Sequence, residues 1–237
     1  MTMQTTSRPG GRRRVTARRR DAERPDTRAA LLEAAGQVFA EKGFDRATGR
    51  EICERAGANA AAINYYFGGT EGLYAAVIEE AHGRLITLEK LTAAVADKPD
   101  ARAKLETIIG LAVDLLTGPI SHSWVLRVLA RELLAPSSVI DRLIEQQGVP
   151  KLRILKGIVG ELMGLPDDHP AVARGCLTLV APCSMLLVAD RRMLRRAFPQ
   201  LHLGRDHAAA LARHLIDYAL AGLATIGREA RGGELST

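Results

Sequence analysis

Apolar residues along this chain recur at the spacing of α-helices from about residue 26 to residue 228. In the first such stretch, five apolar residues fall on one helix face: Leu31, Leu32, Ala35, Val38 and Phe39. The same pattern predicts later helices at 48–56, 60–67, 71–94, 101–117, 123–134, 137–163, 170–191 and 206–228. No stretch shows the alternation of apolar and polar residues that is typical of a strand, so the predicted fold class is all-α.

Capping and turn residues place two short helices close together in the N-terminal part. Thr48 and Glu51 fit the capping box S/T-x-x-E, which opens a helix. Gly57 supplies a tight turn, and Asn59 is a suitable N-cap for the next helix, which ends before Gly68. Two helices joined in this way have the layout of a helix-turn-helix, which places its second helix in the major groove of DNA.

The pattern divides the chain into three parts. Residues 1–25 lack apolar periodicity and are predicted to form a flexible basic arm. Residues 26–70 are predicted to form the helix-turn-helix domain, whose first helix starts near Asp26, and residues 71–237 a larger helical body. Within the body, Pro150 is expected to kink or split a helix, because proline has no amide hydrogen to donate.

Charge is concentrated at the N-terminus. Residues 1–28 hold nine arginines and three acidic residues, which amounts to the whole net charge of +6. The remaining 209 residues hold 24 basic and 24 acidic residues. A basic block of this kind attracts polyanions. We expect the arm to add sequence-independent affinity for DNA, and the alternative is a solvated tail that affects solubility only.

The sequence predicts no membrane partner. The longest apolar run, Cys176–Ala189, contains Pro182 and is shorter than a bilayer-spanning helix requires. The first residues lack the apolar stretch of a signal peptide. Three cysteines, an odd number without an export signal, are typical of a reducing compartment, so the expected location is the cytoplasm.

The third predicted helix has a face suited to reading bases. Its side chains there are small or form hydrogen bonds: Ala60, Ala61, Ala62, Asn64 and Tyr65. An asparagine amide can bond both major-groove positions of adenine, and alanine methyls can contact thymine methyls. The hydroxyls of Thr48 and Tyr66 suit phosphates, which fix the register without reading sequence. The alternative is a plain helical bundle in which Asn59 is only a cap.

The stretch Thr27–Val77 resembles the N-terminal domain of TetR-family transcriptional regulators. The residues that carry the resemblance are Thr27-Arg28, Ala34-Ala35, Phe39–Phe44, Thr48, Ile52, Ala56-Gly57, Tyr65–Phe67, Glu71 and Leu73-Tyr74. More narrowly, the segment Asn59–Gly69 is similar to the CecR-like subgroup, and Arg131–Ser137 is similar to part of that subgroup's C-terminal domain.

The resemblance implies a homodimer whose two DNA-binding domains bind a palindromic operator, with a small-molecule inducer pocket in each body. It also implies a dimer interface formed by the helices at 170–191 and 206–228. Carried over by position, the DNA contacts are Thr48, Asn59, Ala60, Ala61, Asn64, Tyr65 and Tyr66. Thr70 stands where the family usually has a lysine, which weakens one phosphate contact. Pro182-Cys183 stand where the subgroup tends to have Gly-Gln, which puts a transfer of its pocket or interface in doubt.

Candidate ligand-binding residues lie in the body. Trp124, Arg127 and Arg131 share a helix face and would give a pocket an aromatic wall and positive charge, suited to an acidic or polar aromatic ligand. The alternative is that Trp124 is core and Arg131 pairs with a structural carboxylate. Three sulfur-containing residues, either lining an adaptable apolar cavity or packed in the core, are Met163, Met185 and Cys183.

A stripe of mostly small residues along the last helix permits close helix packing, either between two copies or within one: Ala208, Ala212, Leu215, Ala219 and Gly222. Cys176 and Cys183 share a face, where buried thiols are the ordinary interpretation and a redox switch is the alternative. The six histidines form no cluster with the spacing of metal ligands, and no metal or cofactor is expected.

These features predict a ligand-responsive transcriptional repressor. It would bind double-stranded DNA as a homodimer and be released by a small-molecule inducer. An activator or architectural DNA-binding protein is the alternative, because the same DNA-binding domain would serve it. A small helical enzyme is a more distant alternative, and no nucleophile-base pair, P-loop or metal motif supports it.

Overall fold

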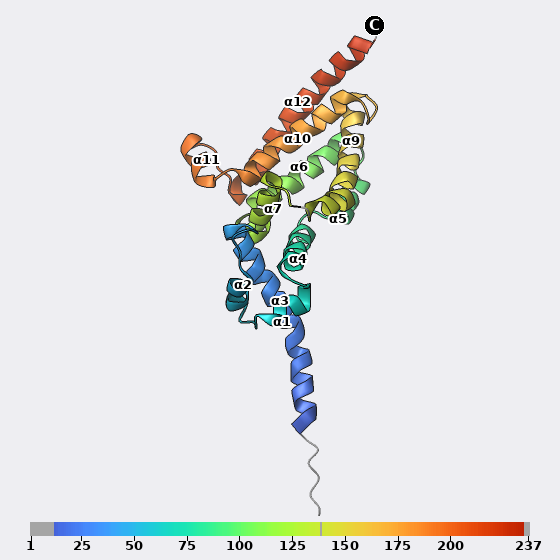
Figure 1. The fold of residues 1–237 in the computed structure, drawn as a ribbon. Coiled ribbons are helices and arrows are strands. Elements are labelled where there is room, and N and C mark those ends of the chain that lie inside the picture. Colours follow the sequence, from blue (N-terminus) through green and yellow to red (C-terminus); the bar gives the residue numbers. More distant parts are fainter. Residues whose placement is uncertain (1–11, 138, 235–237) are drawn as a thin grey trace, which may run out of the picture. The chain divides into compact units, whose positions relative to one another are not determined.

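The structure is a computed structural model that describes residues 12–137 and 139–234 (Figure 1). Internal contacts divide the chain into an N-terminal unit that ends at Val77 and a body that begins at Ile78. Helices form both units, and no strand occurs among the described residues. The predicted all-α fold class is therefore confirmed.

The N-terminal unit consists of α1 (Arg12–Lys42), α2 (Gly49–Ala56), α3 (Ala61–Phe67) and the first part of α4 (Thr70–Gly83). The helix start expected near Asp26 is wrong, because α1 already begins at Arg12. Arginine and alanine are strong helix formers, so a segment rich in both can be helical without an apolar stripe. The part of the expected arm at 1–11 lies outside the described residues.

The core of the N-terminal unit is built on Phe39, whose side chain is fully buried. The Phe39 and Tyr74 rings form a T-shaped pair with a centroid distance of 4.9 Å, and the centroid of the Phe44 ring lies 6.0 Å from that of Phe39. Ile52 of α2 and Ile63 of α3 are buried as well. Each short helix therefore contributes one large, buried apolar side chain to this core.

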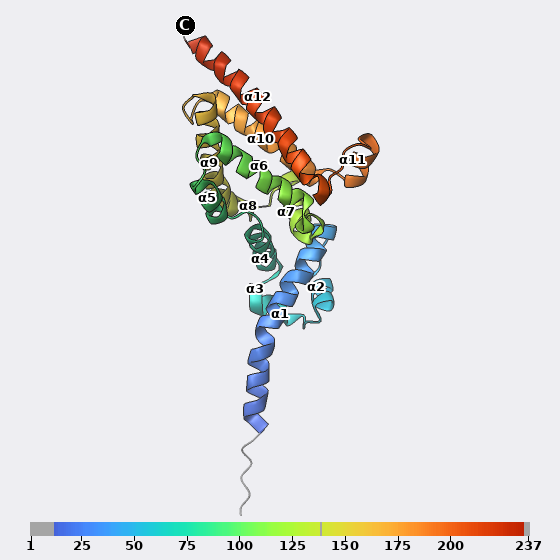
Figure 2. The ribbon, with the colours of Figure 1, turned by 180° about the vertical axis from the view of Figure 1, so that it is seen from behind.

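The body contains α5 (Leu88–Ala96), α6 (Ala101–Thr117), α7 (Trp124–Leu134), α9 (Val149–Met163), α10 (Pro170–Val188) and α12 (Ala208–Glu234). Shorter elements join them: η1 (Pro119–His122), α8 (Ile140–Leu143), the π-helix η2 (Ile144–Gly148), α11 (Arg191–Ala197) and η3 (Arg205–His207). The long helices α6, α10 and α12 lie side by side in both views, and α11 projects away from them (Figures 1 and 2).

Two predicted helices are divided in the structure. The single helix expected at 71–94 is wrong: α4 ends at Gly83, and Thr87 caps α5 by accepting the Lys90 amide at 3.3 Å. The division expected near Pro150 is confirmed, since α9 begins at Val149 directly after the π-helix. The helix expected at 170–191 ends at Val188, because Asp190 caps the separate helix α11.

The body core lies where α6, α9, α10 and α12 meet. Met163 and Val159 of α9 are fully buried there. A Cβ on Gly175 of α10 would lie 2.9 Å from Leu223 Cδ2 and 3.2 Å from Val159 Cγ1, so glycine permits this close packing. At the end of α9, Arg231 of α12 donates to the Met163 carbonyl. This contact satisfies one backbone acceptor that the helix leaves open.

The mostly small stripe of α12 faces the inside of the body. Ala208 and Ala219 are buried in the core, and Ala212 and Leu215 pack against it. These four residues therefore contribute to packing within one copy, while the role of the stripe in a dimer interface stays a prediction. The exposed apolar residues of α10 and α12 are different ones: Leu177, Val180, Met185, Tyr218 and Ile226.

Helix α10 is, among the described residues, the one helix long and apolar enough by length and composition to cross a membrane. The run read from the sequence seemed too short because it began at Cys176, whereas the helix begins at Pro170. A single helix of this kind is weak evidence for a membrane span, since helices of soluble proteins meet the same criteria.

Candidate nucleic-acid interface and ligand cavities

The helix-turn-helix is fixed by the capping residues that the sequence predicted. Thr48 Oγ1 accepts the Glu51 amide at 3.3 Å and opens α2. Gly57 ends α2 in the left-handed conformation, with φ of 63°, which glycine adopts without steric cost. Asn59 Oδ1 accepts the Ala61 amide at 2.9 Å at the start of α3. These interactions fix where α2 begins and ends and where α3 begins.

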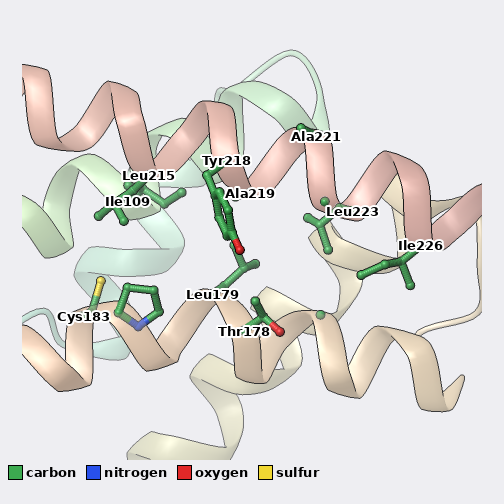
Figure 3. Close-up of a pocket in the computed structure, with 13 residues that line it drawn as sticks. Ile109, Thr178, Leu179, Cys183, Leu215, Tyr218, Ala219, Ala221, Leu223 and Ile226 are labelled. Atoms are coloured by element: carbon green, nitrogen blue, oxygen red, sulfur yellow. The ribbon is translucent and has the colours of Figure 1, made fainter.

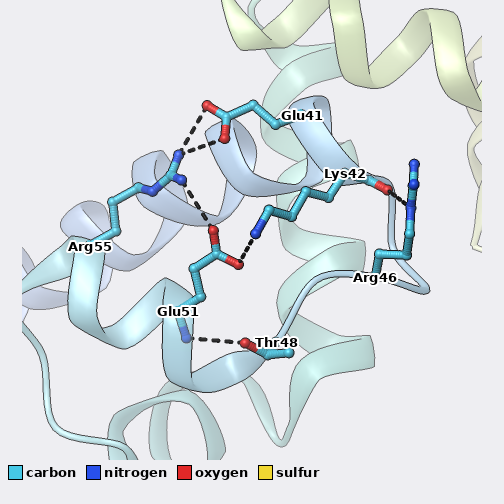
Figure 4. Close-up of polar contacts among 6 residues, drawn as sticks. All are labelled: Glu41, Lys42, Arg46, Thr48, Glu51 and Arg55. Carbon is cyan, nitrogen blue, oxygen red and sulfur yellow. Dashed lines mark hydrogen bonds and ion pairs between the residues drawn. The ribbon is translucent and has the colours of Figure 1, made fainter.

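The Glu51 carboxylate makes one ion pair with Lys42 of α1 and one with Arg55 of its own helix α2 (Figure 4). One oxygen lies 2.7 Å from Lys42 Nζ and the other 3.2 Å from Arg55 Nη2. Arg55 also binds the Glu41 carboxylate at 3.0 Å, and this hydrogen bond raises the pKa of Arg55. Because the pairs are partly exposed, each contributes little to stability. Their larger effect is to neutralise positive charge on this domain.

The outward face of α3 has the form expected of a base-reading surface. Ala60, Ala61, Asn64 and Tyr65 are exposed, while Ile63 on the opposite face is buried. The Tyr65 side chain is 67% exposed, and its ring forms a T-shaped pair with the Tyr66 ring at a centroid distance of 4.9 Å. No lysine or arginine occurs in α3.

The predicted DNA-contact residues gather around a hollow on this surface. Four of the seven line it: Asn59, Ala61, Tyr65 and Tyr66. Thr27 of α1 lines it as well. The sequence did not single out Thr27 as a contact, although it belongs to the stretch that carries the family resemblance. The hollow is thus formed by α1, the α2–α3 turn and α3 together.

The predicted ligand residues are dispersed in the body. Trp124 is 3% exposed, and its indole Nε1 has no hydrogen-bond partner in the described part of the chain. The Arg84 guanidinium lies 5.1 Å from the Trp124 ring centroid. Arg127 is exposed and Arg131 half-buried. Met163 is fully buried, whereas Met185 is 52% exposed.

Two apolar cavities occupy other parts of the body. The first, of about 260 Å³, lies between α10 and α12 beside α6, where Leu179, Leu215 and Leu223 line it (Figure 3). The second, of about 180 Å³, lies among the α4–α5 connection, α6, α7 and α10. None of the five predicted ligand residues is among the described residues that line either cavity. Cys183, the third sulfur residue considered from the sequence, lines both.

A third cavity, of about 250 Å³, lies between the end of α4 and the segment of α8 and the π-helix η2, and polar side chains form part of its lining. Its polar side chains include Glu79, His82, Arg142 and Gln146. His82 Nε2 lies 3.2 Å from Lys151 Nζ. Burial, and then the charge of Lys151, lowers the pKa of His82 to about 4. The imidazole is therefore neutral at physiological pH and can accept a hydrogen bond from the lysine.

Acidification is expected to destabilise the body through His82. The unfolded chain binds a proton at His82 between pH 6.5 and about 4, whereas the folded chain does not. The free energy of unfolding therefore falls as the pH drops through this window. For a half-exposed ring we expect a loss on the order of 1 kcal/mol after solvent screening. Urea denaturation at pH 6.5 and at about pH 4 measures this loss in the free energy of unfolding.

His82→Gln should reduce this pH dependence, because glutamine does not titrate. His214→Gln, at an exposed position of α12, is the matched control and should keep the dependence of the unchanged protein. If the free energy of unfolding of the His82→Gln protein depends on pH as strongly as that of the unchanged protein, His82 is not the group responsible.

Comparison with known proteins agrees with this architecture. The family model "HTH-type transcriptional dual regulator CecR, C-terminal domain" matches residues 101–226, more than half of the chain. The model "Bacterial regulatory proteins, tetR family" matches residues 31–77. The probable HTH-type transcriptional regulator YttP of Bacillus subtilis (strain 168) is 29% identical over 136 residues. That match covers 57% of this chain and 64% of YttP, just under two thirds of its length.

Solved structures share the fold at low sequence identity. FadR of Bacillus subtilis in complex with stearoyl-CoA is 20% identical, with a TM-score of 0.60 over 82% of this chain and 98% of FadR. AibR in complex with isovaleryl coenzyme A and operator DNA is 14% identical, with a TM-score of 0.60 over 82% of this chain and 96% of AibR. Because the family models match both the N-terminal unit and more than half of the chain, this protein belongs to the TetR family of bacterial transcriptional regulators, with a C-terminal domain of the CecR type.

Proposed function

We propose that this protein is a cytoplasmic repressor that binds a palindromic operator as a homodimer and is released by a small-molecule inducer. The observation that carries the proposal is the outward face of α3, where exposed Asn64 and Tyr65 stand beside exposed alanines. Selection of bound sequences from random DNA tests it, with a two-fold symmetric site as the expected result. Recovery of no symmetric sequence would contradict it.

Roles in DNA binding follow from position on the helix-turn-helix. Asn64, Tyr65 and the methyls of Ala60 and Ala61 would face base edges from α3. The hydroxyls of Thr48 and Tyr66 would contact phosphates, and so would the exposed residue Asn59. The exposure of the α3 residues and the hollow that four of the seven share support this assignment.

The arginine-rich N-terminus would supply the nonspecific affinity that the domain lacks. In the domain, Lys42 and Arg55 pair with Glu51, and Arg50 pairs with Glu54 at 2.7 Å. Deleting residues 1–24, which removes eight arginines, should make operator affinity less dependent on salt. Each lost phosphate contact reduces the slope of log affinity against log salt by about 0.9.

Fluorescence anisotropy of labelled operator over a range of salt concentrations measures this slope. Arg46→Ala, a single exposed change within the domain, serves as comparison and should alter the slope by at most about one contact. An unchanged slope after the deletion would show that the N-terminus affects solubility only.

The proposed dimer interface consists of α10 and α12. Both helices expose large apolar side chains, with Leu177 70% and Tyr218 67% exposed. Apolar side chains gathered on a surface commonly mark a protein interface, and a second copy would cover those of both helices symmetrically. The same partner would account for the apolar composition of α10 without a membrane.

The effect on transcription separates repression from activation. The family model that matches the body takes its name from a dual regulator, CecR, which makes activation a second candidate. A reporter gene placed behind the selected operator decides between them. Repression predicts higher expression when the protein is deleted, and activation predicts lower expression.

The inducer would bind within the body and oppose operator binding. FadR and AibR, which share the fold, were solved with acyl-coenzyme A ligands, and AibR also with operator DNA. The apolar cavities of this body suit the hydrocarbon part of such a ligand. Linkage makes the opposition reciprocal, so operator DNA should weaken ligand binding by the same factor by which ligand weakens DNA binding.

A further inference from the structure

The two apolar cavities of the body meet at one side chain. Among the described residues that line them, Cys183 alone lines both. On α10, Leu179 lines the first cavity and Leu187 the second, four residues to either side of Cys183. On α6, Ile109 lines the first and Ala112 the second. Residues three or four apart are neighbours on a helix surface, so the cavities follow one another along the same two helices.

The chemistry of both linings is aliphatic. No charged side chain is among the described lining residues of either cavity, and the few polar groups include Thr178, Tyr218 and Ser184. Burying a charged or strongly polar ligand group there would be costly. The volumes of about 260 and 180 Å³ each lie below the 300–1,000 Å³ that is usual for ligand pockets, whereas together they fall within it.

We propose that the two cavities form one channel for the straight hydrocarbon chain of an acyl ligand, which passes Cys183. This inference rests on the proposed ligand response and names the ligand class. A slim, flexible chain can pass a small side chain, whereas a wide ring system would fill only one cavity. Burial raises the pKa of Cys183, so the thiol is uncharged at neutral pH and compatible with a hydrocarbon neighbour.

Because the hydrocarbon chain has to pass Cys183 to reach the second cavity, the affinity for an acyl ligand should depend on the length of that chain. A short chain occupies one cavity, and a chain that passes Cys183 buries further methylenes in the other. The second cavity is bounded by Leu85 and Ile86 of the α4–α5 connection. Helix α4 is covalently continuous with the DNA-binding unit. A ligand that reaches these two residues therefore contacts the segment through which the body is joined to that unit.

A series of straight-chain acyl-coenzyme A thioesters, from butyryl to stearoyl, tests the channel by calorimetric titration of the full chain. Affinity should rise roughly fourfold for each added methylene until both cavities are filled. Cys183→Trp should block the passage and bring the affinity of long chains down to that of short ones, a loss of roughly tenfold or more. Cys183→Ala, which keeps the passage open, is the control and should retain the rise.

Alkylation of the unchanged protein provides a test that needs no variant. Stearoyl-coenzyme A should protect Cys183 from iodoacetamide, as read at peptide level by mass spectrometry, and free coenzyme A should not. The buried Cys53 and Cys176 are internal references. Equal alkylation with and without stearoyl-coenzyme A, or an affinity independent of chain length, would overturn the channel.

Operator binding by the ligand-free protein separates this inference from the proposed function. A protein that binds its operator and no member of the acyl series overturns the channel alone. A protein that binds long chains past Cys183 and no symmetric DNA site supports the channel and overturns the proposed repressor.

Discussion

Replacing Asn64 by alanine is expected to weaken operator binding by about 30-fold or more and to leave the fold intact. A bidentate amide–adenine contact contributes about 1–3 kcal/mol of base discrimination. A dimer on a two-fold operator loses two such contacts, or roughly 2–6 kcal/mol. The Asn64 side chain is exposed, so its removal leaves no cavity in the core.

The measurement compares the selected operator with unrelated DNA of equal length. Asn64→Ala should weaken only the specific complex, because nonspecific affinity arises from phosphate contacts. Tyr66→Phe is the informative control: it removes a hydroxyl assigned to phosphate and should weaken both complexes by similar factors. A uniform loss for Asn64→Ala would show that this residue contacts the backbone and reads no base.

Local sequence signals predicted the helix-turn-helix because its geometry is locally determined. Thr48 and Asn59 cap the two helices with their own side chains, and Gly57 adopts the left-handed conformation that ends the first. These interactions span no more than a few residues. The capping box itself is only half formed, since the Glu51 carboxylate binds Lys42 and Arg55. The spacing of the capping box did not indicate that Lys42 of α1 and Arg55 of α2 would bind the Glu51 carboxylate instead.

Helix boundaries failed where apolar periodicity ran across a break. The pattern at 71–94 continues through the α4–α5 connection, because Leu85 and Ile86 are apolar in a non-helical segment. The signals that mark the break, Gly83 and the Thr87 cap, were present and were outweighed by periodicity. The opposite occurred in α1, which already begins at Arg12, although the residues before Asp26 lack apolar periodicity.

Spacing also could not decide which face of a helix meets core, cavity or partner. Trp124, Arg127 and Arg131 have the spacing of a shared face, yet Trp124 is buried, Arg131 is half-buried and Arg127 is exposed. Four of the five residues in the small stripe of α12 also pack within the body, a contribution that their spacing alone did not distinguish from a dimer interface. The ligand-binding role of the five predicted residues stays a prediction. The cavities depend on how α6, α10 and α12 come together, which no local signal encodes.

Phe39→Ala is expected to destabilise the N-terminal unit by about 3–5 kcal/mol, which is the usual cost of truncating a buried phenylalanine. The Phe39 side chain is fully buried and contacts the rings of Tyr74 and Phe44. Small domains have only about 5–15 kcal/mol of stability, so a large part of it would be lost. Hydrogen exchange resolved by peptide measures the effect in this unit separately from the body.

Tyr65→Ala is the matched control in the same unit. Its side chain is 67% exposed, so the free energy of unfolding should change by no more than about 0.5 kcal/mol. Both variants should bind operator weakly, for different reasons. In Phe39→Ala the amides of α1 to α3 would exchange faster, because the surface that α3 presents depends on the core beneath it. In Tyr65→Ala they would exchange as in the unchanged protein, because only the contact with DNA is removed. Equal exchange in the two variants would show that the core around Phe39 does not hold the reading helix in place.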